Sequence, residues 1–199
     1  MFEVQNLKIH GVESMTFSLS TGECLAIEGP SGSGKTLLLR ALADLDPVEG
    51  ERSLDGISYI DMSGPEWRLQ VRYNAAEPGW WSDMPADCFM NPNIIRKRLH
   101  EVGLDEKCLE RPLVQLSTGE RQRLSLLRIL EGAPKVLLLD EPTGPLDPEV
   151  TMQVETLLQG ICRAGTSILI VTHDKAQSVR LSDRKMTIRN GRVEFANHP

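Results

Sequence analysis

The sequence has no long hydrophobic run and no excess of positive charge. Its longest apolar stretches, "VLLL" and "ILIV", are far shorter than the roughly 20 residues that a membrane-spanning helix needs. The N-terminus, "MFEVQNLKIHG", lacks the basic segment and apolar run of a secretory signal. The formal net charge of -6 argues against nucleic acid, so we expect no nucleic-acid partner. Any membrane role is therefore expected to need a partner chain.

Cysteine is also scarce. The 4 cysteines lie far apart and form no C-x-x-C pair. This spacing argues against a zinc site or a disulfide framework, and it favours a reducing compartment. A length of 199 residues predicts a single domain, 1–199, that can bury a core without cross-links.

The distribution of apolar residues predicts an α/β fold. The stretches "KVLLLDEP" and "TSILIVTHD" are continuous apolar runs that end in polar residues, which is typical of parallel strands buried on both faces. Between them, Asp147 can cap a helix, Pro148 suits its first position and Gly165 can end it. Alternating apolar residues before position 20 predict antiparallel strands, and "RNGR" predicts a hairpin turn near the C-terminus. We expect a mainly parallel central sheet with an N-terminal antiparallel β subdomain.

Prolines are frequent between residues 77 and 116, at positions 78, 85, 92 and 112, with short helical pieces between them. This segment, about 77–116, is expected to be a short inserted helical subdomain. The core of the domain would then be about 1–76 and 117–199.

The stretch "GPSGSGKT" satisfies the pattern G-x-x-x-x-G-K-[ST] and lies between a predicted strand and a predicted helix. Its glycines let successive backbone N–H groups point at phosphate oxygens, and the helix directs its positive end at the same anion. Lys35 adds a positive charge at the phosphates, and Thr36 offers a hydroxyl to Mg²⁺. The predicted ATP-binding loop is Gly29, Pro30, Ser31, Gly32, Ser33, Gly34, Lys35 and Thr36.

Two carboxylates follow the buried run "KVLLL", at positions 140 and 141. A strand end of this kind lies beside the phosphate loop in related sheets. Asp140 is expected to reach the Mg²⁺ ion together with Thr36. Glu141 is expected to polarise a water toward the terminal phosphate, which favours hydrolysis over transfer to a second substrate.

The stretch "LSTGERQR", residues 116–123, resembles the signature loop of the ABC ATPase family. The whole chain is similar to that family, because its motifs follow in the family's order. They are "GPSGSGKT", "LSTGERQR", "KVLLLDEP", "GPLD" and "VTHD". The resemblance implies a phosphate-loop ATPase fold of ABC type and Mg²⁺-dependent hydrolysis of ATP that is coupled to transport.

The resemblance also implies partners. Ser117 and Gly119 begin a helix, where Glu120 can complete a capping box, and a helix start is an anion site. In the family this site completes the ATP of an opposite ATPase domain, here expected to be a second copy of the chain. His173 would contact the γ-phosphate. An integral membrane permease would contact the region Ala76–Trp81 and hold the chain at the cytoplasmic face of the inner membrane.

The sequence departs from the family pattern in two places. Ala76 stands where the family has a glutamine that touches the Mg²⁺ site, and a methyl group cannot do this; Asn74 or a water is the alternative. No Tyr or Phe lies near Ile9, where the family stacks an aromatic ring on adenine, which leaves His10 as a candidate. At least one of Trp80 and Trp81 is expected to be exposed, and it is a candidate contact for the permease.

Three functions remain open from the sequence. The first is the ATP-hydrolysing subunit of an ABC transporter, and fragments of the chain are similar to small bacterial ATPases of putative metal or iron export systems. The second is an ABC ATPase that acts without a transporter, but such proteins usually carry a second ATPase domain or long inserts. The third, raised by Ala76, is a regulatory module that binds ATP and barely hydrolyses it, against which Glu141 and His173 argue.

Overall fold

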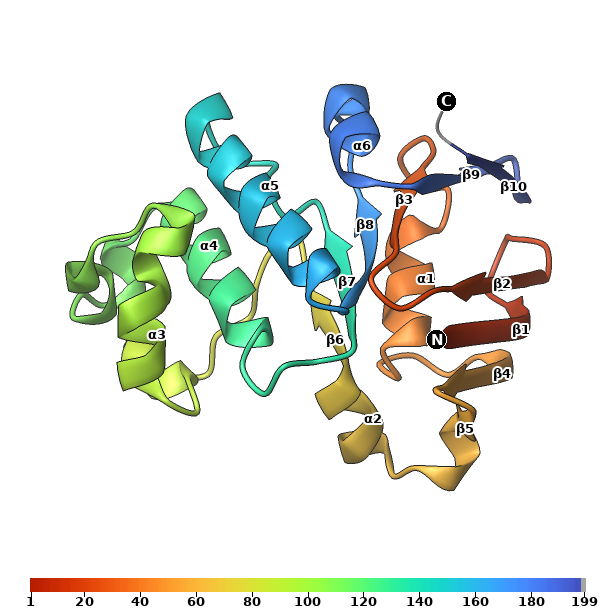
Figure 1. Cartoon of the computed structure of the whole chain (residues 1–199), viewed down its shortest axis with the longest axis horizontal. Coiled ribbons are helices and arrows are strands. Elements are labelled where there is room, and N and C mark those ends of the chain that lie inside the picture. Colours follow the sequence, from red (N-terminus) through yellow and green to blue (C-terminus); the bar gives the residue numbers. More distant parts are fainter. Residues whose placement is uncertain (198–199) are drawn as a thin grey trace.

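The computed structural model describes residues 1–197 and contains two sheets (Figure 1). One is antiparallel, in the order β2-β1-β4-β5, and its strands are β1 (Phe2–Lys8), β2 (Met15–Leu19), β4 (Glu49–Leu54) and β5 (Ile57–Ser58). The other has the order β10-β9-β3-β8-β7-β6. Its strands are β3 (Cys24–Glu28), β6 (Val71–Asn74), β7 (Val136–Asp140), β8 (Ser167–Val171), β9 (Arg184–Arg189) and β10 (Arg192–Asn197). All pairs in this second sheet are parallel except β9 with β10.

Six α-helices accompany the sheets among the described residues. They are α1 (Lys35–Leu42), α2 (Gly64–Gln70), α3 (Pro92–Arg98), α4 (Thr118–Ile129), α5 (Pro148–Arg163) and α6 (Lys175–Leu181). Short 3-10 helices flank α3 at 85–88, 99–102, 106–109 and 113–115, and another lies at 59–61. In Figure 1 the segment around α3 lies at the opposite end of the molecule from the antiparallel sheet. Between β6 and α4 the chain therefore forms one α-helix and mostly 3-10 turns.

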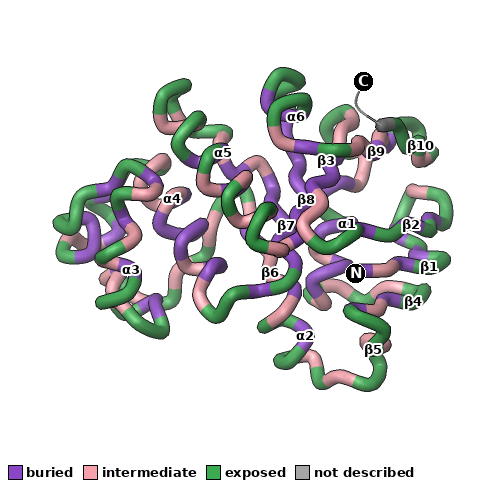
Figure 2. The backbone as a smooth tube through the Cα atoms, in the orientation of Figure 1, coloured by how far each residue is buried: buried purple, intermediate pink, exposed green. Residues whose placement is uncertain are grey.

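The central strands are buried on both faces, which explains their continuous apolar sequences. Leu25 and Ile27 of β3 pack into a core with α1 and the antiparallel sheet, whereas Cys24 and Ala26 face a second core that includes residues of α4 and α5. β7 and β8 divide their residues between the two cores in the same alternating way. Figure 2 shows this buried band through the middle of the molecule. A rigid sheet thus holds the loops that follow β3, β7 and β8.

The end signals in the sequence match the observed helices. Asp147 caps α5 by accepting a hydrogen bond from the Val150 N–H, and Ser117 forms a capping box with Glu120 at the start of α4. The C-terminal hairpin turns at Asn190, whose φ of 51° precedes a glycine with positive φ. These local predictions are confirmed.

Two helices were not expected from the sequence. α2 begins with a capping box of Ser63 and Glu66, and it buries Trp67. α6 begins at Lys175, after the cap residue Asp174. The helix after the phosphate loop is also shorter than its apolar pattern suggests, since α1 ends at Leu42 and Asp44 adopts a left-handed backbone with φ 60°. Within residues 1–197, no helix is both long enough and apolar enough to cross a membrane.

Candidate functional site

The phosphate loop connects β3 to α1, and all three of its glycines, including Gly32, have positive φ. Gly34 has φ 102° and caps α1, and Gly29 has φ 150°. A Cβ atom on Gly29 would lie 2.3 Å from the carbonyl oxygen of Ile188 on β9. The loop is therefore pressed against the neighbouring strand β9, and the backbone of Gly29 has a conformation that residues with a side chain rarely adopt.

The interior of this loop has the donors that a phosphate requires. Lys35 is only 7% exposed, and its Nζ donates to the carbonyl oxygens of Gly29 and Pro30, each at 2.9 Å. The buried Oγ of Ser33 has no hydrogen-bond partner. A buried ammonium held by carbonyls of its own loop, beside an unpaired hydroxyl, fits an anion better than it fits a closed core.

Asp140 lies at the end of β7, beside this loop, and is only 3% exposed. Its Oδ2 accepts hydrogen bonds from Thr36 Oγ1 at 2.7 Å and from the Tyr73 hydroxyl at 3.2 Å. No group of three or more acidic, His or Cys side chains that could cage a metal occurs in residues 1–197. One carboxylate and one hydroxyl suit Mg²⁺, which takes its other ligands from water and nucleotide phosphates. The burial of Tyr73 and the charge of Asp140 raise the pKa of the Tyr73 phenol, so it remains a donor.

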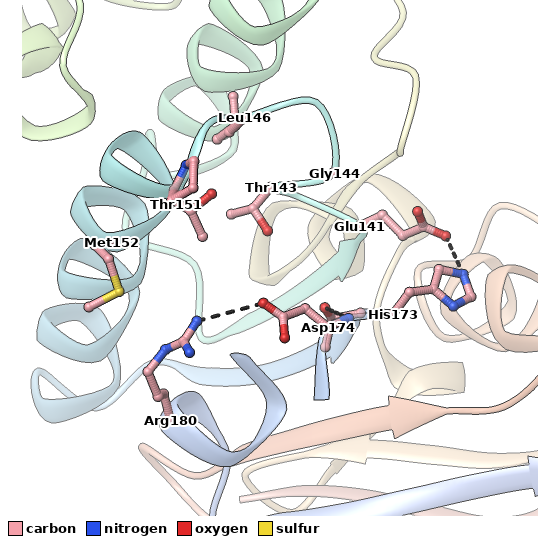
Figure 3. Close-up of a pocket in the computed structure, with 11 residues that line it drawn as sticks. Glu141, Thr143, Gly144, Leu146, Thr151, Met152, His173, Asp174 and Arg180 are labelled. Atoms are coloured by element: carbon pink, nitrogen blue, oxygen red, sulfur yellow. Dashed lines mark hydrogen bonds and ion pairs between the residues drawn. The ribbon is translucent and has the colours of Figure 1, made fainter. Parts of the chain in front are cut away.

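Glu141 and His173 follow the adjacent strands β7 and β8, and their side chains point toward each other in Figure 3. His173 Nε2 lies 3.0 Å from Glu141 Oε1. Glu141 has a left-handed backbone with φ 48°, and its N–H donates to the Val171 carbonyl at 3.0 Å. A non-glycine residue held in this region costs roughly 1 kcal/mol or more, and such residues are common at functional sites.

The phosphate loop, Glu141 and His173 share one pocket of about 200 Å³. Its lining is Ser31, Gly32, Gly34, Lys35, Thr36, Leu37, Glu141 and His173. The acid and the imidazole thus face the position of the phosphates across the loop, although they lie more than 100 residues further along the chain. This geometry suits attack of a water on a bound phosphate.

Ser117 and Gly119 are not part of this pocket's lining. Ser117 is exposed and caps α4, where its Oγ accepts from the Glu120 N–H at 3.1 Å. A Cβ on Gly119 would lie 3.1 Å from Leu146, so the start of α4 packs against the "GPLD" loop of the same chain. Glu120 is partly desolvated, but hydrogen bonds from the Ser117 N–H and from Arg111 lower its pKa to about 2. The start of α4 is therefore a rigid site with free N–H groups near the surface.

Tyr73 was not expected at this site from the sequence, for which Asn74 or a water was the alternative to Ala76. Ala76 is exposed in the segment that follows β6. Asn74 is 1% exposed and accepts a 2.6 Å hydrogen bond from Ser125 of α4, so it faces away from Asp140. Alternation along β6 places Tyr73 on the other face, where it reaches Asp140. Alternation separates Tyr73 from Asn74, but the contact of Tyr73 with Asp140 also depends on the pairing of β6 with β7, which the sequence does not show.

The remaining candidates, His10 and the two tryptophans, do not line the pocket of the phosphate loop. His10 is exposed. The side chains beside Gly34 of the phosphate loop are instead those of Val12 and Ile9. They would lie 3.0 and 3.5 Å from a Cβ atom added to that glycine. Trp80 packs against the second core, while Trp81 is 69% exposed. The expectation that at least one of the two tryptophans faces solvent is confirmed.

The chain is similar to ATP-binding proteins of transport systems. The family model described as "ABC transporter" matches residues 12–144. Aliphatic sulfonates import ATP-binding protein SsuB 2 of Agrobacterium fabrum is 35% identical over 92% of this chain and 71% of its own length. Probable iron export ATP-binding protein FetA of Escherichia coli is 34% identical over 89% of this chain and 84% of its own length.

Solved structures share the fold. A dimeric ATP-binding cassette in a post-hydrolysis state, bound to ADP and Pi, superposes with a TM-score of 0.86 at 24% identity, over 99% of this chain and 98% of the other. An ATP binding subunit of an ABC transporter gives 0.85 at 25% identity, over 98% and 89%. The family model, the curated relatives and the fold agree with the motifs, so the chain belongs to the ABC transporter family, as one of its ATP-binding, ATP-hydrolysing subunits.

Proposed function

We propose that this chain hydrolyses ATP as one of two identical subunits that close head to tail over two nucleotides, and that this closure drives a separate integral membrane permease. One observation carries the proposal. The phosphate loop shares its pocket with Glu141 and His173, whereas the second anion site, at Ser117 and Gly119, is outside that pocket, with Ser117 exposed and Gly119 half-buried. Each chain therefore offers a nucleotide site that is complete only when the start of α4 comes from a partner.

Within this site each residue has a distinct task. Lys35 exchanges its two carbonyl partners for the β- and γ-phosphates of ATP, and the loop N–H groups hold the phosphate oxygens. Glu141 accepts the proton of the attacking water. His173 donates a hydrogen bond to the γ-phosphate, for which its present contact with Glu141 must open.

A Mg²⁺ ion is expected beside Thr36 and Asp140, whose hydroxyl and carboxylate oxygens are ligands that this ion prefers. When bound, it would neutralise charge on the β- and γ-phosphates during hydrolysis. Tyr73 keeps the Asp140 carboxylate oriented toward that position.

The permease is expected to contact the region Ala76–Trp81. A groove of about 230 Å³ beside it is lined by Leu45, Arg72, Trp81 and Arg128, among others. Trp81 is 69% exposed and Leu45 is 44% exposed, and apolar side chains gathered on a surface are typical of protein contacts. Through this contact the chain would lie at the cytoplasmic face of the inner membrane. The relatives named above include an import and an export protein. We therefore expect the permease, rather than this chain, to determine which molecule is transported.

The test is ATP turnover together with molar mass in solution, for the wild type and Glu141→Gln in the presence of Mg-ATP. We expect turnover in the wild type, and in the variant a dimer held together by ATP with turnover reduced at least about 100-fold. Equal turnover in both proteins would show that Glu141 is not the base. Binding of ATP with neither turnover nor dimer formation would favour the regulatory module instead.

A further inference from the structure

A chain of polar side chains, of which Gln177 and Glu155 are buried, connects the loop after Glu141 to the helix after His173. Thr143, two residues beyond Glu141, exchanges hydrogen bonds with Gln177 in the first turns of α6. The Gln177 Nε2 donates to Thr143 Oγ1 at 2.9 Å, and the Thr143 hydroxyl lies 3.2 Å from Gln177 Oε1. These are side-chain contacts between segments 34 residues apart in the sequence.

Gln177 is in turn fixed by α5. It is 1% exposed, and its Nε2 also donates to Oε1 of the buried Glu155 at 3.1 Å. Arg180 neutralises Glu155 with two hydrogen bonds of 2.7 Å each. A buried amide whose donors and acceptor are all engaged, next to a paired carboxylate, has little freedom to rotate.

These hydrogen bonds join the segments that follow Glu141 and His173. The β7 and β8 ends are already joined by the hydrogen bond from the Glu141 N–H to the Val171 carbonyl. Beyond that point the two segments separate, as Figure 3 shows for Glu141 and Thr143 after β7 and for His173 and Asp174 before α6. The contact between Thr143 and Gln177 joins the two segments a second time, beyond the strand ends. This contact limits how far the side chains of Glu141 and His173 can separate. It also helps to hold the left-handed backbone conformation of Glu141.

We propose that Gln177 is a positioning residue for hydrolysis: through Thr143 it fixes where Glu141 lies relative to His173. The proposal rests on the roles of Glu141 and His173 in the proposed function. An amide is required at position 177, because it donates to Glu155 and to Thr143 with the same nitrogen and still accepts from the Thr143 hydroxyl. A carboxylate there would face the carboxylate of Glu155 and could not donate to either partner.

The experiment compares Gln177→Leu, Thr143→Val and the double variant, each of which removes hydrogen bonds with little change in volume. The control is Gln159→Leu on α5, whose Nε2 donates to the Arg180 carbonyl at 3.2 Å and so also joins α5 to α6 without contacting Thr143. For each protein we would measure kcat and KM for Mg-ATP, the Kd for ATP and the melting temperature.

We expect Gln177→Leu and Thr143→Val each to lower kcat about 10-fold with KM within about two-fold of wild type, because only the arrangement needed in the transition state is lost. The double variant should be no slower than the slower single variant, since both remove one connection. Gln159→Leu should retain wild-type kcat.

Three results would overturn the proposal: a kcat within two-fold of wild type for Gln177→Leu, multiplicative losses in the double variant, or an equal loss in Gln159→Leu. The Glu141→Gln variant, measured in the same series, separates this failure from that of the proposed function. If Glu141→Gln is inactive while Gln177→Leu is fully active, only the positioning role is wrong. If Glu141→Gln is fully active, the function proposed for the site is wrong, and the positioning role with it.

Discussion

The hydroxyl of Tyr73 lies 3.2 Å from Oδ2 of Asp140, the carboxylate expected to approach the magnesium ion. The two residues belong to neighbouring parallel strands, in which Tyr73 pairs with Leu138, two residues before Asp140. The sequence resemblance places Ala76 where the family has a glutamine. Tyr73 is a polar side chain of β6, and its hydroxyl contacts Asp140. This hydrogen bond holds the Asp140 carboxylate from the side opposite to Asn74.

Replacement of Tyr73 by Phe should therefore affect both folding and metal binding. Removal of one donor from a buried carboxylate lowers the free energy of unfolding by about 1–3 kcal/mol. Loss of the hydrogen bond from Tyr73 to the expected Mg²⁺ ligand Asp140 should also weaken Mg²⁺ binding. The Mg²⁺ concentration that gives half of the maximal rise in melting temperature should increase about 10-fold. Both can be measured on the protein with ATP, the first by urea unfolding and the second by the dependence of the melting temperature on Mg²⁺.

Tyr59→Phe is the matched control for that experiment. Tyr59 also donates to a carboxylate, that of Asp44, but neither residue lines the nucleotide pocket. We expect Tyr59→Phe to lower stability and to leave the Mg²⁺ dependence unchanged. An unchanged Mg²⁺ dependence in Tyr73→Phe as well would mean that Tyr73 only stabilises the fold.

The parts of the site that could be predicted from sequence are those written in contiguous residues. The phosphate loop, the acidic pair after β7 and the cap of α4 each depend on a few neighbours and a local backbone shape. Tyr73 and Gln177 could not be identified in this way, because their roles depend on strand pairing and on helix packing between distant segments. α2 was missed although Ser63 and Glu66 form a capping box, because Trp67 is the one residue of this helix that is fully buried.

Gly29→Ala should strongly destabilise the chain and abolish ATP binding. The added Cβ would lie 2.3 Å from the Ile188 carbonyl and 2.8 Å from Ser33 Oγ, at a φ of 150°. Backbone strain and the displacement of β9 together should cost about 3 kcal/mol or more. Urea unfolding and equilibrium binding of ATP measure the two effects.

Gly56→Ala provides the comparison for this prediction. Gly56 also has a positive φ, of 79°, but a Cβ there would meet no atom within 4 Å. This variant should lose about 1 kcal/mol from strain alone and should bind ATP normally. If both variants were equally stable, the close approach of Gly29 to Ile188 would not constrain the loop.

A mixing experiment tests whether Ser117 acts on the nucleotide of the other subunit. Lys35→Ala should disable the phosphate loop, and Ser117→Arg should disable the start of α4, so each protein alone should have little ATPase activity. In a mixed dimer one nucleotide site combines the intact loop of one chain with the intact Ser117 of the other. We therefore expect mixing to restore a substantial fraction of activity, measured as phosphate release. No restoration, with mixed dimers demonstrated by mass, would contradict the head-to-tail arrangement.

Protonation of Glu120 at low pH should reduce the stability that its capping box at the start of α4 contributes to the fold. Its carboxylate accepts hydrogen bonds from the Ser117 N–H at 2.8 Å and from Arg111 at 2.6 Å, and although its partial burial opposes them, the pKa falls from an ordinary 4.5 to about 2. A group whose pKa is lowered by folding stabilises the native state above its unfolded value and loses that contribution as the pH falls through its folded value. Glu120 should therefore contribute fully above pH 4.5 and progressively less down to about pH 2. In urea unfolding, Glu120→Gln should be less stable than wild type at neutral pH, and the difference should vanish near pH 2.

Glu66→Gln, at the same position of the α2 capping box but with no arginine partner, should show a smaller pH-dependent difference. A difference for Glu120→Gln that stays constant with pH would mean that the charge of Glu120 does not fix Ser117 at the start of α4.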